Sequence, residues 1–362
     1  MPQLDSCSTM RAASAPCRRR ICAVPAPPFA EAERAAHVAE LFTQAGAAPC
    51  TDATGNVIAW FGPPDEPAAV FAAHLDTVFP AGTRIEFAET EGRISAPGFG
   101  DNSLGVAALL HLARFLAAQP VARAIALAAT VGEEGLGDLR GAKALVEQLP
   151  CRAFVAVEGQ TLDAITVAGV GSVRLRVQVT GPGGHPWGNR DHANAAHGLI
   201  EALAPALNEL RSPELALNVN MLTAGTAINV LPDTATAEID LRCEDEQRLQ
   251  AAAVRLIEIA SGRDPQLSVQ VKQIGDRPGG RIAADHPLLA AARRARAVAG
   301  LAAATEEASS TDANAAHGRG IPAITVGVST GGNAHRLDDY VDVPPIAAGL
   351  RSLEALALEL SR

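Results

Sequence analysis

The chain has 362 residues, of which 48% are hydrophobic, and it is therefore long enough for two domains. Its formal net charge of −10 argues against nucleic acid as a partner, because there is no excess of basic residues to displace counterions. It contains no run of about 18 uncharged apolar residues, so no membrane-spanning segment is expected.

The cysteines indicate a reducing compartment. All six are scattered, and no two have CxxC spacing, which argues against a zinc knuckle and against a disulfide framework. In residues 1–28, prolines interrupt an apolar part that is too short for the apolar core of a signal peptide. We therefore expect a cytoplasmic protein in which residues 1–28 are disordered.

Residues 29–170 alternate between helical periodicity and apolar strands. Apolar residues recur at helical spacing in three segments, 31–45, 103–119 and 141–149. Strands are predicted within four segments, 54–62, 68–75, 124–135 and 153–160. The last three are continuous apolar runs, as in strands buried on both faces. Strands that alternate with helices are typical of an α/β sheet with several parallel members.

The pattern changes after Gly171. Polar and apolar residues alternate over 172–181, as in an antiparallel strand with one face in water. From 171 to 275 the predicted order is strand, helix, strand, strand, helix, strand, which is that of a ferredoxin-like domain. A helix and a buried strand return at 287–300 and 321–329. The sequence therefore predicts an α/β domain, 29–170 with 276–362, that is interrupted by an α+β domain at 171–275.

Acidic and metal-binding side chains follow the buried strands of the α/β domain. In open α/β sheets ligands bind at the carboxyl ends of the strands, so we expect these side chains to converge. They are His74 and Asp76, Glu133 and Glu134, and Glu158, and two loops add Asp101 and His335. Converging charges without basic partners need cations. Two histidines and three of these five carboxylates would form a mixed nitrogen and oxygen set that suits zinc, with cobalt or manganese as substitutes.

Each of these residues alone also has an ordinary structural explanation. A histidine and an aspartate two residues apart are often a surface or core pair, and adjacent glutamates often lie on a solvated helix face. Asp101 alone could cap the helix that follows it. The prediction of a metal site therefore depends on the joint order of the residues, each at a strand end or in a glycine-rich turn.

Eight motifs occur in a characteristic order. They are "HLDTVFP", "GFGDNSLG", "GEEGLGDLRGAK", "VEGQ", "GPGGHPWG", "INVLPDTATAEIDLR", "SSTDAN" and "GGNAHRLDD". In this order they resemble the co-catalytic zinc hydrolases that include peptidase T, glutamate carboxypeptidase, acetylornithine deacetylase and aminoacylase. The resemblance covers roughly residues 30–360, and "GEEGLGDLRGAK" looks most like the peptidase T-like branch.

The resemblance implies a site for two zinc ions. His74 and Glu158 would bind one ion, Glu134 and His335 the other, and Asp101 would bridge them. Asp76 would orient His74 by accepting its second ring N–H, since residues i and i+2 share one face of a strand. Glu133 would be the general base for a metal-activated water.

The resemblance also assigns substrate contacts to the inserted domain, at His185, Asn229 and Arg242. Arg242 would form a bidentate pair with a substrate carboxylate, and its alternative is a salt bridge at a strand end. His185 is otherwise a turn residue. Relatives pair their inserted lid domains, which implies a homodimer in which His185 reaches the active site of the neighbouring subunit.

These features favour a dizinc hydrolase that cleaves the amide bond of small peptides, as an exopeptidase of the dipeptidase, tripeptidase or carboxypeptidase type. An N-acyl amino acid deacylase of the same family is the alternative. Glu158 does not decide between them, because relatives carry aspartate or glutamate at that position. A non-catalytic binding relative should lack some ligands, whereas all five and Glu133 are present. The sequence contains no GxSxG motif, which argues against a serine hydrolase.

Overall fold

The computed structural model describes residues 20–261 and 264–362, and the chain forms two compact units. The first unit contains the described residues up to Gly169 together with Arg281–Arg362, and the second contains Val170–Gly280. Among the described residues, no helix is long and apolar enough to cross a membrane.

The first unit is built on a mixed sheet. In the described part of the chain its strands follow the order β1-β2-β6-β3-β7-β15-β8-β13, and β14 pairs with β8. The central strand β3 pairs in parallel with β6 and with β7, and β7 pairs in parallel with β15. The strands are β1 (Pro49–Thr51), β2 (Val57–Phe61), β3 (Ala68–His74), β6 (Ile125–Thr130), β7 (Cys151–Glu158), β8 (Ala164–Gly169), β13 (Gly280–Arg281), β14 (Thr305–Ser309) and β15 (Ala323–Gly327).

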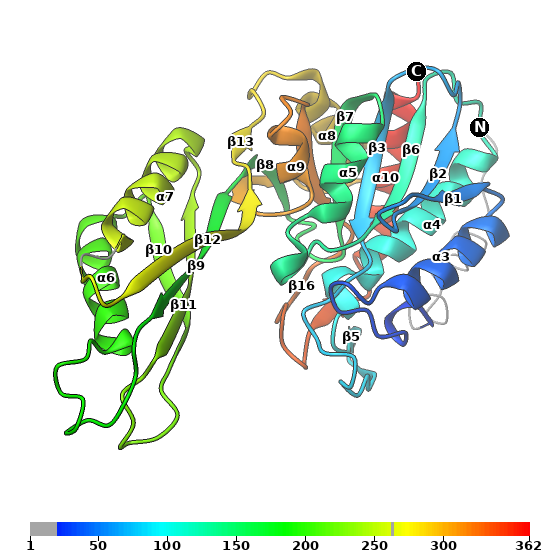
Figure 1. Ribbon diagram of the computed structural model, residues 1–362. Helices are drawn as coiled ribbons and strands as arrows, with labels where there is room; N and C mark the ends of the chain where they lie inside the picture. Colours follow the sequence, from blue (N-terminus) through cyan, green and yellow to red (C-terminus); the bar gives the residue numbers. More distant parts are fainter. Residues whose placement is uncertain (1–19, 262–263) are drawn as a thin grey trace. The chain divides into compact units, whose positions relative to one another are not determined.

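Helices cover both faces of this sheet (Figure 1). Along β3, Phe71 packs into the core shared with α3, α4, α8 and α10, whereas its neighbours Val70 and Ala72 pack against α5 and α9. All seven residues of β3 are buried, which explains its continuous apolar sequence. The predicted α/β class is confirmed. The helices are α3 (Ala32–Gln44), α4 (Leu104–Ala117), α5 (Arg140–Gln148), α8 (Pro287–Val298), α9 (Ala313–His317) and α10 (Ile346–Leu360).

A smaller antiparallel sheet brings two distant loops of the first unit together. Its strands are, in order, β16 (Gly331–Gly332), β17 (Tyr340–Asp342), β5 (Arg93–Ser95) and β4 (Ala88–Thr90). Because β17 pairs with β5, residues 96–103 lie beside residues 333–339, and the N–H of Ala96 donates to the carbonyl of Asp339 at 2.9 Å. The first of these loops carries Asp101 and the second carries His335.

The second unit has the predicted ferredoxin-like order. Its antiparallel sheet has the strand order β10-β11-β9-β12, and α6 and α7 pack against β9 and β11. Every second residue of β9 from Val173 to Val179 is buried, so the period-two pattern marks the face beneath the helices. The elements are β9 (Gly171–Thr180), α6 (Ala195–Glu209), β10 (Ala216–Ala224), β11 (Thr234–Cys243), α7 (Glu246–Ala260) and β12 (Ser268–Arg277).

The expected disorder of residues 1–28 is wrong for residues 20–28, and residues 1–19 lie outside the described residues. The side chains of Ile21 and Cys22 are completely buried in the core of the first unit. Arg34 of α3, itself 2% exposed, donates to the carbonyls of Cys22 and Val24. Burial of apolar side chains and these hydrogen bonds fix the segment, although its prolines suggested a loose chain.

Candidate metal centre

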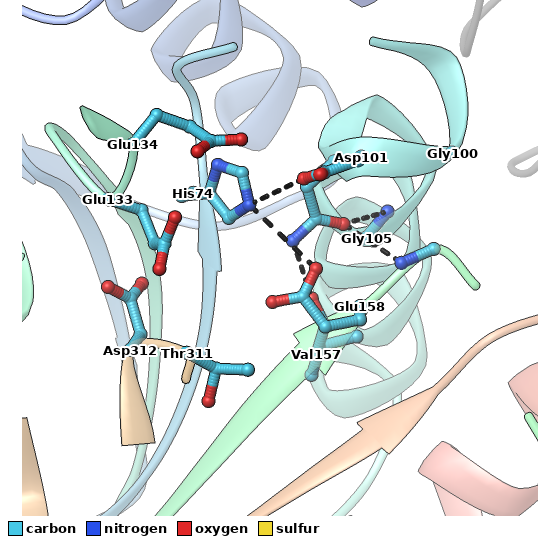
Figure 2. Close-up of polar contacts among 12 residues, drawn as sticks. His74, Gly100, Asp101, Gly105, Glu133, Glu134, Val157, Glu158, Thr311 and Asp312 are labelled. Atoms are coloured by element: carbon cyan, nitrogen blue, oxygen red, sulfur yellow. Dashed lines mark hydrogen bonds and ion pairs between the residues drawn. The ribbon is translucent and has the colours of Figure 1, made fainter. Parts of the chain in front are cut away.

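The carboxyl ends of three neighbouring parallel strands form the base of the site (Figure 2). His74 is the last residue of β3 and Glu158 the last residue of β7, while Glu133 and Glu134 follow β6 within four residues. The predicted convergence of these side chains therefore occurs in the structure, at the sheet edge where ligands bind in open α/β folds.

Asp101 occupies the centre of two groups of candidate ligands. In one group, Nε2 of His74 lies 3.1 Å from Oδ1 of Asp101 and 3.8 Å from Oε2 of Glu158. In the other group, Nε2 of His335 lies 3.2 Å from Oδ2 of Asp101 and 3.2 Å from Oε1 of Glu134. Each group places three ligand atoms within 4.8 Å of one another. Because Asp101 offers a different oxygen to each group, its carboxylate has the arrangement of a bridging ligand.

The electrostatics of both groups suit cations. Hydrogen bonds to Asp101 and Glu134 raise the pKa of His335 to about 10. Burial alone would lower the pKa of His74, but its hydrogen bond to Asp101 and the charge of Glu158 raise it well above the usual value. Burial raises the pKa of Glu158. The carboxylates thus favour the protonated form of both histidines, and this positive charge balances the carboxylates as a bound cation would.

The donor types fit zinc. Imidazole nitrogen and carboxylate oxygen are its usual ligands beside thiolate, and cobalt and manganese accept the same mixed set. Three carboxylates in a largely buried site also need a compensating positive charge. Each of the two groups that share Asp101 therefore has the composition of a site that could hold a metal ion.

Asp76 contacts different groups from those expected. Nδ1 of His74 lies 3.0 Å from the backbone carbonyl of Asp76, whereas the Asp76 carboxylate accepts the backbone N–H groups of Glu133 at 2.9 Å and Glu134 at 2.7 Å. The expectation that the carboxylate accepts the ring N–H of His74 is therefore wrong. The strand β3 ends at His74, so the rule that residues i and i+2 share a face does not extend to Asp76.

Asn102 fixes the backbone on both sides of Glu158. Its side chain donates to the carbonyl of Val157 at 2.9 Å and accepts the N–H of Gly159 at 2.9 Å. Asn102 is completely buried and directly follows Asp101. It therefore links the segment of the shared carboxylate to the end of β7. This role was not predicted from the sequence, although Asn102 lies within the motif "GFGDNSLG".

A buried acid lies beside Glu133. The carboxylate of Asp312 accepts the hydroxyl of Thr130, the last residue of β6, at 2.5 Å. Burial and the nearby charge of Glu133 raise the pKa of Asp312 to about 7, and Figure 2 shows its carboxylate facing that of Glu133. The signal in the sequence was the motif "SSTDAN", whose residues equally resemble helix caps.

The three predicted substrate contacts all lie in the second unit. Asn229 is exposed in the turn after β10. His185 is exposed, and its Nδ1 accepts the backbone N–H groups of Trp187 at 3.2 Å and Gly188 at 3.1 Å. These donors leave the ring proton on Nε2, which can donate to a ligand.

Arg242 already has a carboxylate partner. Its Nε and Nη2 lie 3.0 and 2.9 Å from Oδ2 of Asp240, and the hydroxyl of Ser172 donates to the other oxygen of Asp240. The alternative expectation for Arg242, a salt bridge at a strand end, therefore holds for the edge of the guanidinium that contacts Asp240. Arg242 remains 42% exposed, which leaves donors for a second anion.

The chain is similar in sequence to known proteins. The model of the family described as "Peptidase family M20/M25/M40" matches residues 70–359. A protein of Mycobacterium tuberculosis named "Putative succinyl-diaminopimelate desuccinylase DapE" is 29% identical over 293 residues, which cover 78% of this chain and 79% of that protein.

Solved structures share the fold of the whole chain. Aminopeptidase PepT from Bacillus cereus has a TM-score of 0.75 and 22% identity, and the match covers 98% of this chain and 99% of that one. A tripeptidase from Staphylococcus aureus has a TM-score of 0.78 and 19% identity, with the same coverage of 98% and 99%.

Proposed function

The chain belongs to peptidase family M20/M25/M40, a family of metal-dependent hydrolases, and from this premise we propose that it is a dizinc exopeptidase that cleaves small peptides. The observation that carries the proposal is the position of Asp101, whose two carboxylate oxygens lie 3.1 and 3.2 Å from two different histidines. Cobalt or manganese are candidate substitutes for zinc.

Five side chains would hold the ions, one set being His74, Asp101 and Glu158 and the other Asp101, Glu134 and His335. When bound, two divalent ions polarise the scissile carbonyl and lower the pKa of the attacking water. The backbone contacts of Asp76 and Asn102 keep the ligand-bearing turns at fixed positions.

Glu133 is proposed as the general base. It belongs to neither ligand group, and its neighbour Glu134 takes the ligand position. The Glu133 carboxylate would take a proton from the attacking water and give it to the leaving nitrogen of the amide. Asp312 faces it in Figure 2, and the two acids interact electrostatically.

The second unit would bind the substrate. Arg242, held by Asp240, has donors left for the carboxylate of a peptide or amino acid. The Nε2–H of His185 is suited to donate to the scissile carbonyl oxygen as negative charge develops on it. Asn229 is the third proposed contact. We extend the proposal to a homodimer through this unit, in which His185 serves the neighbouring subunit.

A deacylase acting on N-acyl amino acids is the second candidate. The favouring observation is the 29% identity with a protein named as a desuccinylase, because such an enzyme also cleaves an amide beside a carboxylate.

The described cysteines Cys22, Cys50, Cys151 and Cys243 are all free thiols, which supports the cytoplasm as the proposed compartment.

The experiment is a substrate panel with zinc-loaded and metal-stripped protein. The panel contains dipeptides, tripeptides, N-acetyl amino acids and N-succinyl amino acids, each as the free acid and as the C-terminal amide. We expect the zinc-loaded protein to hydrolyse peptides and the stripped protein to hydrolyse nothing. Preference for acylated amino acids would select the deacylase. Equal rates for stripped and loaded protein would refute both, and Glu133→Gln controls for contaminating hydrolases.

A further inference from the structure

Asp339 is a buried acid that lies behind the proposed bridging ligand. It follows His335 by four residues, is 0% exposed and belongs to neither group of candidate ligands. Its Oδ2 accepts the backbone N–H of Gly100 at 2.9 Å and that of Asp101 at 3.2 Å. The carboxylate thus holds the peptide units on both sides of the Cα atom of Gly100.

Gln160 completes this arrangement from a third segment. It follows the candidate ligand Glu158 by two residues, and its Nε2 donates to Oδ1 of Asp339 at 2.5 Å. The same nitrogen lies 3.2 Å from the carbonyl of Gly332 and 3.0 Å from that of Tyr340. Because all three neighbours are acceptors, the amide nitrogen and not the amide oxygen must face Asp339.

The backbone at Gly100 and Asp101 depends on these partners. Asp101 has φ −121° and ψ 89°, outside the helical region. Its N–H and that of Gly100 point to Asp339, and a largely buried N–H that loses its acceptor destabilises this backbone conformation. A Cβ atom at Gly100 would lie 2.1 Å from Nε2 of Gln160 and 2.6 Å from Oδ1 of Asp339, so only glycine permits this approach.

We propose that Asp339, together with Gln160, is a positioning residue that directs the Asp101 carboxylate at both metal ions. The proposal rests on the proposed dimetal function. Three ligand-bearing segments meet at this pair: residues 99–103 with Asp101, residues 158–160 with Glu158, and residues 331–340 with His335. The two carboxylate oxygens of Asp101 lie at nearly equal distances from Nε2 of His74 and Nε2 of His335. A small rotation of the Asp101 backbone would therefore bring the carboxylate closer to one ligand group and move it away from the other.

The test is a Co²⁺ titration of metal-free protein, comparing wild type with Asp339→Asn. The asparagine has one acceptor oxygen where three N–H donors converge, so the Asp101 segment should turn. We expect the first ion to bind with affinity within about threefold of wild type and the second about 10–100-fold more weakly, as for other partners of metal ligands. Two Co²⁺ ions that share a carboxylate are magnetically coupled, and the variant should lose the coupled signal in electron paramagnetic resonance.

Asp338→Asn is the matched control. Asp338 is the neighbouring residue, its side chain is 58% exposed, and it pairs with Arg336 and Asn333 rather than with the Asp101 segment. The same loss of charge in the same loop should leave both affinities unchanged. Equal weakening in both variants would overturn the proposal, because charge alone would then explain it.

Gly100→Ala is a second, independent variant that keeps every charge. It should push the pair away from Asp101 and weaken the second ion selectively, and it decides the question if Asp339→Asn fails to fold by circular dichroism. If Asp339→Asn folds and binds both ions with wild-type affinity, the proposal is contradicted and the dimetal function stands. If Asp339→Asn does not fold, wild-type affinities in Gly100→Ala contradict the proposal in the same way. A wild type that binds fewer than two Co²⁺ ions instead refutes the dimetal function, and with it this role of Asp339.

Discussion

Nδ1 of His74 lies 3.0 Å from the backbone carbonyl oxygen of Asp76 and 3.8 Å from the carboxylate of the same residue. The imidazole is therefore oriented by a group that no side-chain substitution removes. The carboxylate is left to accept two N–H groups of the turn that carries Glu133 and Glu134.

This division of contacts makes a prediction for Asp76→Asn. The variant should keep two bound metal ions, because His74 retains its carbonyl partner. Its kcat should fall about 10–100-fold, the usual cost of losing such a partner, because one of the two N–H groups loses its acceptor. Elemental analysis and steady-state kinetics measure the two effects. Loss of one ion from the purified variant would contradict this prediction.

The adjacent glutamates should behave differently. Glu133→Gln should retain both ions and lose about 10²–10⁴ in kcat, because a general base typically contributes that much. Glu134→Gln should instead release one ion, since its Oε1 lies 3.2 Å from Nε2 of His335 in a ligand group. Metal content and turnover of the two variants, prepared side by side, make the comparison. Equal metal loss in both would contradict the assignment.

Subunit exchange tests whether His185 acts on the neighbouring subunit. His185→Ala and Glu133→Gln should each be inactive as homodimers, and the loss of a donor to the carbonyl oxygen typically costs about 10²–10³ in kcat. When the two are mixed, one site of each mixed dimer combines an intact Glu133 with an intact His185 from the partner, so part of the activity should return. Mixed dimers seen by native mass spectrometry without regained activity would place His185 within its own chain.

His317, the last residue of α9, should make stability depend on pH. Burial lowers its pKa to about 4, whereas the unfolded chain has about 6.5. As the pH falls from about 6.5 to 4, the unfolded state takes up a proton that the folded state does not, so the free energy of unfolding decreases by about 3 kcal/mol. Urea unfolding of metal-free His317→Gln should therefore show a flatter pH profile than wild type over this range. Parallel profiles would contradict the prediction, and His197→Gln, at an exposed position on α6, controls for the loss of a histidine.

The sequence predicted those parts of the site that follow from strand order. His74 and Glu158 end parallel strands, and such ends meet at one edge of a sheet whatever the loops do. Asp101 and His335 come together through the pairing of β5 with β17, which no local pattern indicates. They were included as residues of glycine-rich loops, and only their roles as metal ligands came from the resemblance to a known family.

The positioning residues could not be found in the same way. Asp339 holds the backbone of Gly100, 239 residues away, and Asn102 holds that of Val157, 55 residues away. A side chain that binds a distant backbone group leaves no periodic signal, and next to a glycine-rich turn it resembles a helix cap. The segment 20–28 was misjudged for a similar reason, because its order depends on the buried guanidinium of Arg34.

The most direct measurement of the dimetal centre is anomalous diffraction at the zinc absorption edge from crystals of the zinc-loaded protein. We expect two zinc peaks on either side of the Asp101 carboxylate, one beside His74 and Glu158 and the other beside Glu134 and His335. A single peak, or peaks that do not contact Asp101, would contradict it.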